Sequence, residues 1–385
     1  MPATITSHPA QAQGSTDGRD PKKKAAVMPQ PFTRAAKEHQ EPMLDVSQAM
    51  GASSVAMGPF DVPAYGYMRG IWLWVSATGG SGTATVAMKE DAPWSIISEL
   101  ALIDVNGANV VGPVNGYDVY LDNKWFGRNI GDPRLSSMYV APVTGANASG
   151  NFGFLLYVPV EISGRDGLGS LPNANAASTY KLRVTLAPTS EVYTTAPTTA
   201  PTVRVRAWLD AWTQPNATDL RGNANATQPP AMGTTQYLSK TTQTISAGFQ
   251  QPRLTRVGSY IRNVLFIFRG ADGTRASGET NFPSDISMFW DSKNLFTRHK
   301  DLWKSQMVRR SRYTAAAEAA GGRDNGVWLE DFTHEFDGQL GNELRDGWLG
   351  TVQSTRLELS GNFGSNGTLT ILTNDVAPAG PIFME

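Results

Sequence analysis

The sequence contains no cysteine, so disulfide bonds, thiolate nucleophiles and cysteine-ligated metal sites are excluded. Histidine is scarce, and no two of the four histidines have the spacing of metal ligands: they are His8, His39, His299 and His334. Nowhere does an apolar run approach the ~20 residues that a membrane-spanning helix needs. The first residues also lack the apolar core of a secretory signal, so we do not expect export.

Charges of opposite sign are almost balanced. Lysine and arginine number 33, against 34 aspartates and glutamates, which leaves a formal net charge of −1. A folded body with this balance has no overall positive field that would attract nucleic acid. We therefore do not expect direct, sequence-specific binding of nucleic acid.

Residues that form turns are plentiful, with 38 glycines and 24 prolines, and Thr, Ser and Asn crowd between the apolar runs. This mixture is typical of an all-β protein with many turns. The chain has 385 residues, which is too many for one small β domain and about right for two compact domains.

Residues 1–43 differ in composition from the rest of the chain. They contain several prolines, few large apolar residues and one cluster of lysines, formed by Lys22, Lys23 and Lys24. Such a segment cannot bury enough apolar surface to join a core, so we interpret it as a flexible arm with one short helix after Thr33. The lysine cluster indicates either a contact with an anionic surface or a solvated tail.

Residues 44–213 form the first predicted β domain. The run IWLWV at 71–75 is continuously apolar, which predicts a strand covered on both faces. Apolar and polar residues alternate over 180–186 and 203–209, which predicts two strands that each have one buried face. Residues 214–233 are rich in turn formers and poor in large apolar residues, so we assign them as a linker.

Residues 234–385 form the second predicted β domain, and its β pattern restarts with the apolar run VLFIF at 264–268. One segment breaks this rhythm, because residues 299–320 predict a helix of several turns that ends at Gly321. The candidate residues for packing between subunits or domains lie on this helix: Trp303, Gln306, Arg309 and Arg310.

Two common motifs of catalysis are absent from the sequence. It has no nucleophile elbow (G-x-S-x-G) and no phosphate-binding loop (G-x-x-x-x-G-K-[ST]), and we predict neither catalytic residues nor a cofactor. The segment WLEDFTHEFD at 328–337 interleaves acids with aromatics, a pattern that can line a sugar cleft, support glycoside hydrolysis or bind a cation. The simpler interpretation is a strand whose exposed face carries the acids and whose other face is apolar.

Several short motifs have informative spacing and order. In the second domain SYIRN at 259–263 leads into an apolar strand and then RGADG at 269–273, and the helix carries W-x-x-Q-x-x-R-R at 303–310. In the first domain FDV at 60–62 precedes MRG and a hydrophobic strand, and PWSII follows at 93–97. In these motifs the chain resembles the major capsid proteins of tectiviruses, the tailless bacteriophages with a membrane beneath the shell.

The resemblance implies a double jelly roll: two tandem eight-stranded jelly rolls with a few short helices and one longer helix in the second domain. It also implies a homotrimer with a pseudo-sixfold outline, which tiles an icosahedral shell around an internal membrane. The implied partners are further copies of the chain, neighbouring trimers, vertex proteins and the internal membrane, which Lys22, Lys23 and Lys24 would contact from the inner face. The expected location is the virion, with assembly in the host cytoplasm.

A second hypothesis stays open at this point. A β-sandwich that binds or cleaves carbohydrate, such as a viral spike, would share the all-β composition and the acidic–aromatic segment. It would need a groove of exposed aromatics and, for hydrolysis, two carboxylates at a suitable separation. The two hypotheses differ in assembly, because a capsid protein should form a stable trimer that does not bind sugar.

Overall fold

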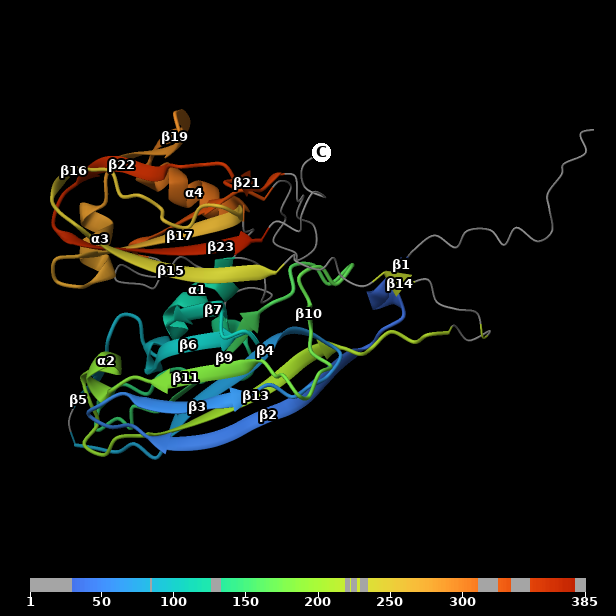
Figure 1. The fold of residues 1–385 in the computed structure, drawn as a ribbon. Helices are drawn as coiled ribbons and strands as arrows, with labels where there is room; N and C mark the ends of the chain where they lie inside the picture. Colours follow the sequence, from blue (N-terminus) through green and yellow to red (C-terminus); the bar gives the residue numbers. More distant parts are fainter. Residues whose placement is uncertain are drawn as a thin grey trace, which may run out of the picture.

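In the computed structural model the chain forms two β-rich lobes that are stacked one on the other (Figure 1). The structure describes residues 30–83, 85–125, 133–218, 222, 227–228, 235–310, 325–333 and 347–377. The main strands of the first lobe end with β13, and those of the second begin with β15, so the lobes follow one another along the chain. No helix in these ranges is long and apolar enough to cross a membrane.

The first lobe is a sandwich of two sets of four antiparallel strands. One set has the spatial order β2-β13-β4-β9, with β2 (Glu38–Ala49), β13 (Thr202–Trp212), β4 (Tyr67–Thr78) and β9 (Phe152–Pro159). The other has the order β3-β11-β6-β7, with β3 (Val55–Asp61), β11 (Lys181–Leu186), β6 (Ile97–Ile103) and β7 (Asn109–Val114). Short strands complete the lobe: β5 (Thr85–Met88), β8 (Gly145–Ala146), β10 (Leu171–Pro172) and β12 (Tyr193–Thr195).

The second lobe is built in the same way. One set of strands has the order β15-β23-β17-β20, with β15 (Gln236–Ile245), β23 (Gly367–Val376), β17 (Tyr260–Gly270) and β20 (Val327–Asp331). The other has the order β16-β22-β18-β19, with β16 (Gly248–Gln250), β22 (Leu357–Phe363), β18 (Asp285–Trp290) and β19 (Lys293–His299). The short β21 (Leu349–Gly350) pairs with β17.

The two lobes have the same topology. When the eight main strands of each lobe are counted in chain order, one sheet reads first, eighth, third, sixth, and the facing sheet reads second, seventh, fourth, fifth. Two facing four-stranded sheets connected in this way form a jelly roll. The predicted fold, two tandem eight-stranded jelly rolls, is therefore confirmed.

Helices lie in the connections between strands. α1 (Gly116–Trp125) joins the fifth and sixth strands of the first roll, and α4 (Lys300–Arg310) joins the same two strands of the second roll. α4 is the predicted longer helix of the second domain; residues 311–320 of that prediction lie outside the described residues. The remaining helices are short: α2 (Thr189–Val192), α3 (Arg275–Asn281), η1 (Phe32–Arg34), η2 (Trp94–Ile96) and η3 (Pro133–Leu135).

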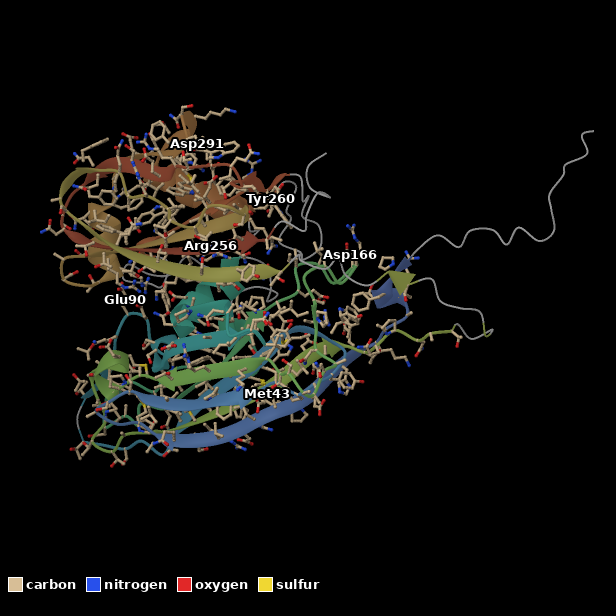
Figure 2. All side chains as sticks on the ribbon, in the orientation of Figure 1. Met43, Glu90, Asp166, Arg256, Tyr260 and Asp291 are labelled. Atoms are coloured by element: carbon tan, nitrogen blue, oxygen red, sulfur yellow. The ribbon has the colours of Figure 1, made fainter. Side chains whose placement is uncertain are left out.

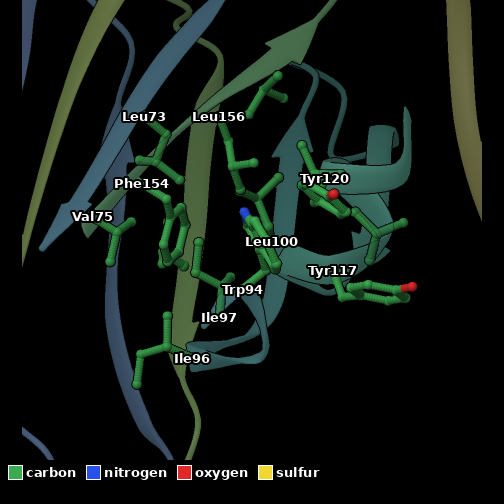
Figure 3. Close-up of a cluster of buried hydrophobic side chains, with 14 of the residues drawn as sticks. Leu73, Val75, Trp94, Ile96, Ile97, Leu100, Tyr117, Tyr120, Phe154 and Leu156 are labelled. Atoms are coloured by element: carbon green, nitrogen blue, oxygen red, sulfur yellow. The ribbon is translucent and has the colours of Figure 1, made fainter. Parts of the chain in front are cut away.

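The core of the first roll lies between its two sheets. Figure 3 shows side chains of β4 and β9, including Leu73 and Phe154, meeting those of η2 and β6, including Leu100, and all three are fully buried. Trp94 of η2 stacks on Tyr120 of α1 with 3.8 Å between ring centroids. This contact extends the core from the sandwich to the helix that lies on it.

The core of the second roll is richer in aromatic residues. Phe282 stacks on Trp328 of β20 with 3.7 Å between ring centroids. Phe268 lies edge-on to Phe363, with ring centroids 5.1 Å apart, which links the two sheets. Offset and edge-on aromatic pairs of this kind add stability beyond the area they bury.

The strand predicted at 71–75 lies within β4, but the chain does not cover it on both faces. Ile71, Leu73 and Val75 point into the core and are fully buried. Trp72 and Trp74 lie on the outer face of the sheet and are only partly buried. The first roll therefore presents an apolar outer face, which the continuous apolar run alone did not distinguish from a buried one. The alternation predicted at 180–186 and 203–209 is confirmed in β11 and β13.

The predicted boundary of the flexible arm, at residue 43, needs correction. β2 begins at Glu38 and pairs with β13 along its whole length. Upstream of it, Phe32 is fully buried, with its ring centroid 4.7 Å from that of Tyr67 and 6.4 Å from that of Trp212. β2 is an edge strand, which tolerates Pro42 and exposes polar residues, and this composition concealed it in the sequence.

The segment between the rolls is only partly described. Within the predicted linker, 214–233, β14 (Thr227–Gln228) pairs in parallel with β1 (Gln30–Pro31). The start of the described chain and the connection between the rolls therefore run side by side, at one end of the molecule (Figure 1).

Candidate functional site

The residues predicted for subunit or domain packing lie on α4. Trp303 is 1% exposed and lies in the second core, with its ring centroid 5.7 Å from that of Phe266 and 5.3 Å from that of Phe296. Its indole N–H donates a hydrogen bond of 2.7 Å to the backbone carbonyl oxygen of Leu329 in β20. Trp303 therefore fixes α4 to the sheet through both its ring and its polar atom.

Gln306 belongs to a polar network beneath α4. Its side-chain carbonyl oxygen accepts a hydrogen bond of 2.7 Å from Arg298 of β19, and Arg298 forms an ion pair of 2.6 Å with Glu330 of β20. The Arg298 guanidinium also lies 3.5 Å from the centroid of the Phe296 ring. Because this pair is largely removed from water, each charge depends on the other for compensation. Arg298 was not predicted, since its partners come from separate elements.

The two arginines of the predicted motif stay candidates for packing between subunits. Arg309 is exposed at the end of α4. The side chain of Arg310 lies outside the described residues. Met307 is instead buried, in the same cluster as Val327 and Leu329 of β20. The lysines Lys22, Lys23 and Lys24 also lie outside the described residues.

A cavity of about 520 Å³ lies beside α4, and the described part of the acidic–aromatic segment lines it. Both of its carboxylates are engaged by neighbours. Glu330 pairs with Arg298, and Asp331 accepts hydrogen bonds from the backbone N–H (2.9 Å) and the hydroxyl (2.8 Å) of Thr333. The expectation that the acids occupy an exposed face is wrong for Glu330, which is buried because Arg298 compensates its charge. Residues 334–337 lie outside the described residues.

The two rolls meet through a buried group of charges. Arg275, the first residue of α3, is fully buried, and its Nε lies 2.6 Å from a carboxylate oxygen of Asp91 in the first roll. Arg269, at the end of β17, lies 2.7 Å from the other oxygen of Asp91. Glu90 lies between the rolls (Figure 2) and accepts hydrogen bonds from the backbone N–H groups of Arg275 (2.6 Å) and Ala276 (3.1 Å). Two adjacent acids of the first roll, Glu90 and Asp91, therefore bind the start of α3 and the end of β17 in the second roll.

The electrostatic environment keeps this junction ionised. Burial alone would raise the pKa of Asp91, but the guanidinium groups of Arg269 and Arg275 outweigh it and hold the pKa below its ordinary value. Burial likewise opposes the charge of Arg275, but Tyr117, Asp91 and Glu90 raise its pKa above the ordinary value. Opposite charges at close range thus dominate over desolvation on both sides of the contact.

The rolls are also joined by β15, which pairs in parallel with β7 of the first roll at Leu238 and Val111. α1 forms a further part of the junction. All ten of its residues are buried. Asp118 forms an ion pair of 2.6 Å with Lys240 of β15, and the ring of Tyr117 lies 4.7 Å from the guanidinium of Arg275. Aliphatic residues of the second roll join the same cluster as α1: Leu238, Leu265, Ile267, Val327, Leu329 and Leu372. α1 therefore packs against the sheet β15-β23-β17-β20 of the second roll.

The outer face of the sheet β2-β13-β4-β9 carries a row of aromatic residues. Trp208 of β13, Trp72 of β4 and Tyr157 of β9 are direct neighbours in register, and the rings of Trp72 and Tyr157 lie 4.5 Å apart. A cavity of about 290 Å³ opens on this row and is lined by Gln40, Trp72, Met138, Leu155 and Trp208. Its walls are apolar apart from the amide of Gln40. The sequence shows the two tryptophans, but it does not show that they lie side by side on the outer face of this sheet.

Comparison with known proteins adds three findings. No known protein family matches the sequence, and no curated protein matches it. Among solved structures, the chain is similar to the major capsid protein of STIV, Sulfolobus turreted icosahedral virus, with a TM-score of 0.59 and 13% identity over 89% of this chain and 98% of that one. It is also similar to the PBCV-1 virus capsid (TM-score 0.57, 14% identity, 89% and 93% covered).

A third similar structure is the major capsid protein P2 from bacteriophage PM2, with a TM-score of 0.51 and 9% identity over 89% of this chain and 97% of that one. Identities this low show a shared fold. The topology and these likenesses together define the chain as a double jelly-roll protein of the architecture found in viral major capsid proteins.

Proposed function

We propose that the protein is a viral major capsid protein, a structural subunit that catalyses nothing. The observation that carries the proposal is the repetition of one topology in two rolls stacked within a single chain. Three copies of such a chain supply six similar walls, and a closed ring of six walls tiles a hexagonal lattice from one gene product. The similarity to capsid structures of STIV, PBCV-1 and PM2 supports this proposal.

The finer parts of the proposal follow from the resemblance to tectivirus capsid proteins. The chain is proposed to form a homotrimer, to contact neighbouring trimers and vertex proteins in an icosahedral shell, and to enclose an internal membrane. The virion is then its location, reached by assembly in the host cytoplasm. The resemblance rests on ordered short motifs such as W-x-x-Q-x-x-R-R at 303–310.

The N-terminal segment is proposed to act at the inner face of the shell. Near an anionic bilayer each of Lys22, Lys23 and Lys24 contributes ~1 kcal/mol, and many copies on one shell would act together. The attraction should weaken with salt, because exposed charges are screened within ~8 Å at physiological ionic strength. Replacing the three lysines with Gln should abolish flotation of assembled particles with anionic liposomes at low salt. Unchanged flotation would remove the lysines from membrane contact.

For carbohydrate cleavage, the alternative function, the structural candidate within the described residues is the cavity beside α4 with its acids and aromatics. The partners of Glu330 and Asp331 argue against it. Glu330 is paired with Arg298, and Asp331 is bonded to Thr333 within its own turn. Inverting and retaining hydrolases need two carboxylates directed at one scissile bond. We therefore favour the structural role.

The test is the native mass of the purified protein, followed by electron microscopy of the particles that it forms. A stable trimer that assembles into closed shells is the expected result, and a glycan array and a hydrolysis screen should be negative. A monomer that binds a defined glycan would overturn the capsid proposal in favour of the alternative.

A further inference from the structure

The start of β2 is bound by a group of charged residues that the proposed function does not use. We propose that Asp210 acts as a pH-sensitive switch, which sets how tightly the start of β2 is held on Arg69. The contacts lie within one chain, so the switch does not depend on the proposed assembly. β2 connects the N-terminal segment to the first roll, and the switch therefore acts where that segment is attached.

Arg69 of β4 lies among three carboxylates that come from different parts of the first roll. Its Nη1 lies 2.9 Å from Oε1 of Glu38, the first residue of β2, and 3.5 Å from Oδ1 of Asp210 in β13. Its Nε lies 2.8 Å from Oε2 of Glu161, which follows β9. Among the described residues no other cation forms an ion pair with these acids. One positive charge therefore faces three negative charges when all three acids are ionised.

Glu161 and Trp212 fix the guanidinium of Arg69 in place. Glu161 is 8% exposed, and it also accepts hydrogen bonds from the hydroxyl of Ser170 (2.9 Å) and from the indole N–H of Trp212 (2.5 Å). The central carbon of the Arg69 guanidinium lies 4.4 Å from the centroid of the Trp212 ring. Because these contacts hold Arg69 from one side, its Nη1 stays directed at the two other acids.

Asp210 is the acid whose charge is compensated least. It is 6% exposed, its contact with Arg69 is the longest of the three, and the hydroxyl of Tyr157 donates a hydrogen bond of 3.2 Å to it. Burial raises the pKa of Asp210 above its ordinary value of 3.8, and the negative charges of Glu161 and Glu38 add to this effect. Arg69 and Tyr157 act in the opposite direction but do not outweigh it. As the pH falls, Asp210 therefore takes up its proton before an ordinary aspartate does.

Glu38 and Asp210 compete for the same nitrogen of Arg69. Ionised Asp210 takes part of the attraction of Arg69 and repels Glu38, whereas protonated Asp210 leaves Nη1 to Glu38 alone. The sign follows from the raised pKa: ionised Asp210 destabilises the folded state, and this effect disappears as the pH falls through the folded-state pKa. The start of β2 is therefore held more tightly in mild acid than at neutral or alkaline pH.

The switch reaches the residues just ahead of β2. Phe32 is fully buried, with its ring 6.4 Å from that of Trp212, which stacks on Arg69. The same ring lies so close to Gly167 that a Cβ there would meet it at 2.2 Å. The end of an edge strand opens more readily than the core of a sheet. Weaker binding of Glu38 should therefore loosen the attachment of the N-terminal segment while the first roll stays folded.

Hydrogen–deuterium exchange of the purified full-length protein tests the switch. The measured quantity is the protection factor of the backbone amides in a peptide that spans residues 36–42, corrected for the intrinsic exchange rate at each pH. Between about pH 8 and about pH 4.5 we expect this protection to increase as the pH falls. The increase should reach at most roughly tenfold for each unit by which the pKa of Asp210 is raised. A peptide from β11 is the internal reference and should not change in this way.

Three variants separate the switch from a general effect of pH. Asp210→Asn cannot ionise but can still accept the hydrogen bond of Tyr157, so the peptide should be highly protected at both ends of the pH range. Glu38→Gln removes the acid that Arg69 binds at the start of β2, so protection should be low at both ends. The matched control is Asp45→Asn, which removes an exposed acid further along the same strand and should keep the pH dependence of the wild type.

Protection that does not change with pH in the wild type would overturn the proposal. The same holds if Asp210→Asn keeps the pH dependence of the wild type, because the titrating group would then lie elsewhere. If Asp210→Asn does not fold, Glu38→Gln decides alone, since Glu38 is exposed over 65% of its side chain and its replacement should not prevent folding. A Glu38→Gln protein with the pH dependence of the wild type would show that Asp210 does not act through the start of β2.

Discussion

The carboxylate of Asp91 in the first roll lies 2.6 Å from the guanidinium of Arg275 in the second, and Arg275 is fully buried. The two residues are 184 positions apart in the sequence. A charge that is removed from water in this way stays ionised only while its partner is present. The pair therefore makes the packing of the two rolls part of the stability of each.

Replacing Asp91 with Asn should lower the free energy of unfolding by about 3–5 kcal/mol, because Arg275 would lose its closest counter-charge while remaining buried. Urea unfolding followed by tryptophan fluorescence measures the change. The control is Asp45→Asn, which removes an exposed partner of Arg204 and should leave stability unchanged. Equal unfolding midpoints for the two variants would show that the junction does not depend on this pair.

Acid should weaken the same contact. The folded-state pKa of Asp91 is held below its ordinary value of 3.8, so the unfolded chain takes up the proton first as the pH falls. The stabilisation is fully present above the ordinary pKa and is lost as the pH falls towards the folded-state pKa. Stability measured from neutral pH down to about pH 3 should fall less steeply for Asp91→Asn than for the wild type. Parallel curves would contradict this assignment.

Replacing Trp303 with Ala should destabilise the second roll by ~3–5 kcal/mol, the usual effect of removing a large buried aromatic side chain. The neighbouring Leu302→Ala is the matched control, because Leu302 lies on the exposed side of the same helix and its loss should leave the melting temperature of the monomer unchanged. Thermal melting and trimer yield are the measurements. A Trp303→Ala protein with full stability and trimer yield would make α4 peripheral.

Two truncations should have different consequences. Removing residues 1–29 should leave folding and trimer formation intact, because that truncation keeps β1 and the buried Phe32. Removing residues 1–42 also deletes Phe32, the first part of β2 and the ion pair of 2.9 Å between Glu38 and Arg69. Loss of the buried phenylalanine alone should cost ~3–5 kcal/mol. Native mass and melting curves compare the two, and equal stability would restore the arm boundary to residue 43.

The sequence predicted the fold where the signal is local. The alternation in β11 and β13 follows from a side chain period of two, and the motif around Trp303 marked a helix that the structure contains. α1 was not predicted because all of its residues are buried, so apolar residues do not recur with the period of an amphipathic helix. Its charged residues Asp118 and Lys124 also interrupt the apolar sequence. β2 was missed because an edge strand carries little apolar sequence.

The charged contacts could not be predicted from the sequence. Arg298 meets Glu330 and Gln306 from two other elements, and Asp91 meets Arg275 from the other roll. Nothing in the residues adjacent to any of them indicates a partner, because the pairing depends on tertiary structure alone. The position of the aromatic row on the outer face of β2-β13-β4-β9 could not be predicted either. The apolar run at 71–75 predicts a strand, but not that the side chains of Trp72 and Trp74 stay partly exposed.

The parallel pairing of β1 with β14 fixes the position of residues 30–31, which is useful for attaching a fusion partner. It places residues 30–31 at one end of the stacked rolls, whereas α2 and α3 lie at the opposite end (Figure 1). A label or cargo fused ahead of residue 30 would therefore emerge from the first end, and a peptide inserted beside α2 would be presented at the second. One chain could carry two payloads on opposite surfaces of whatever it assembles into.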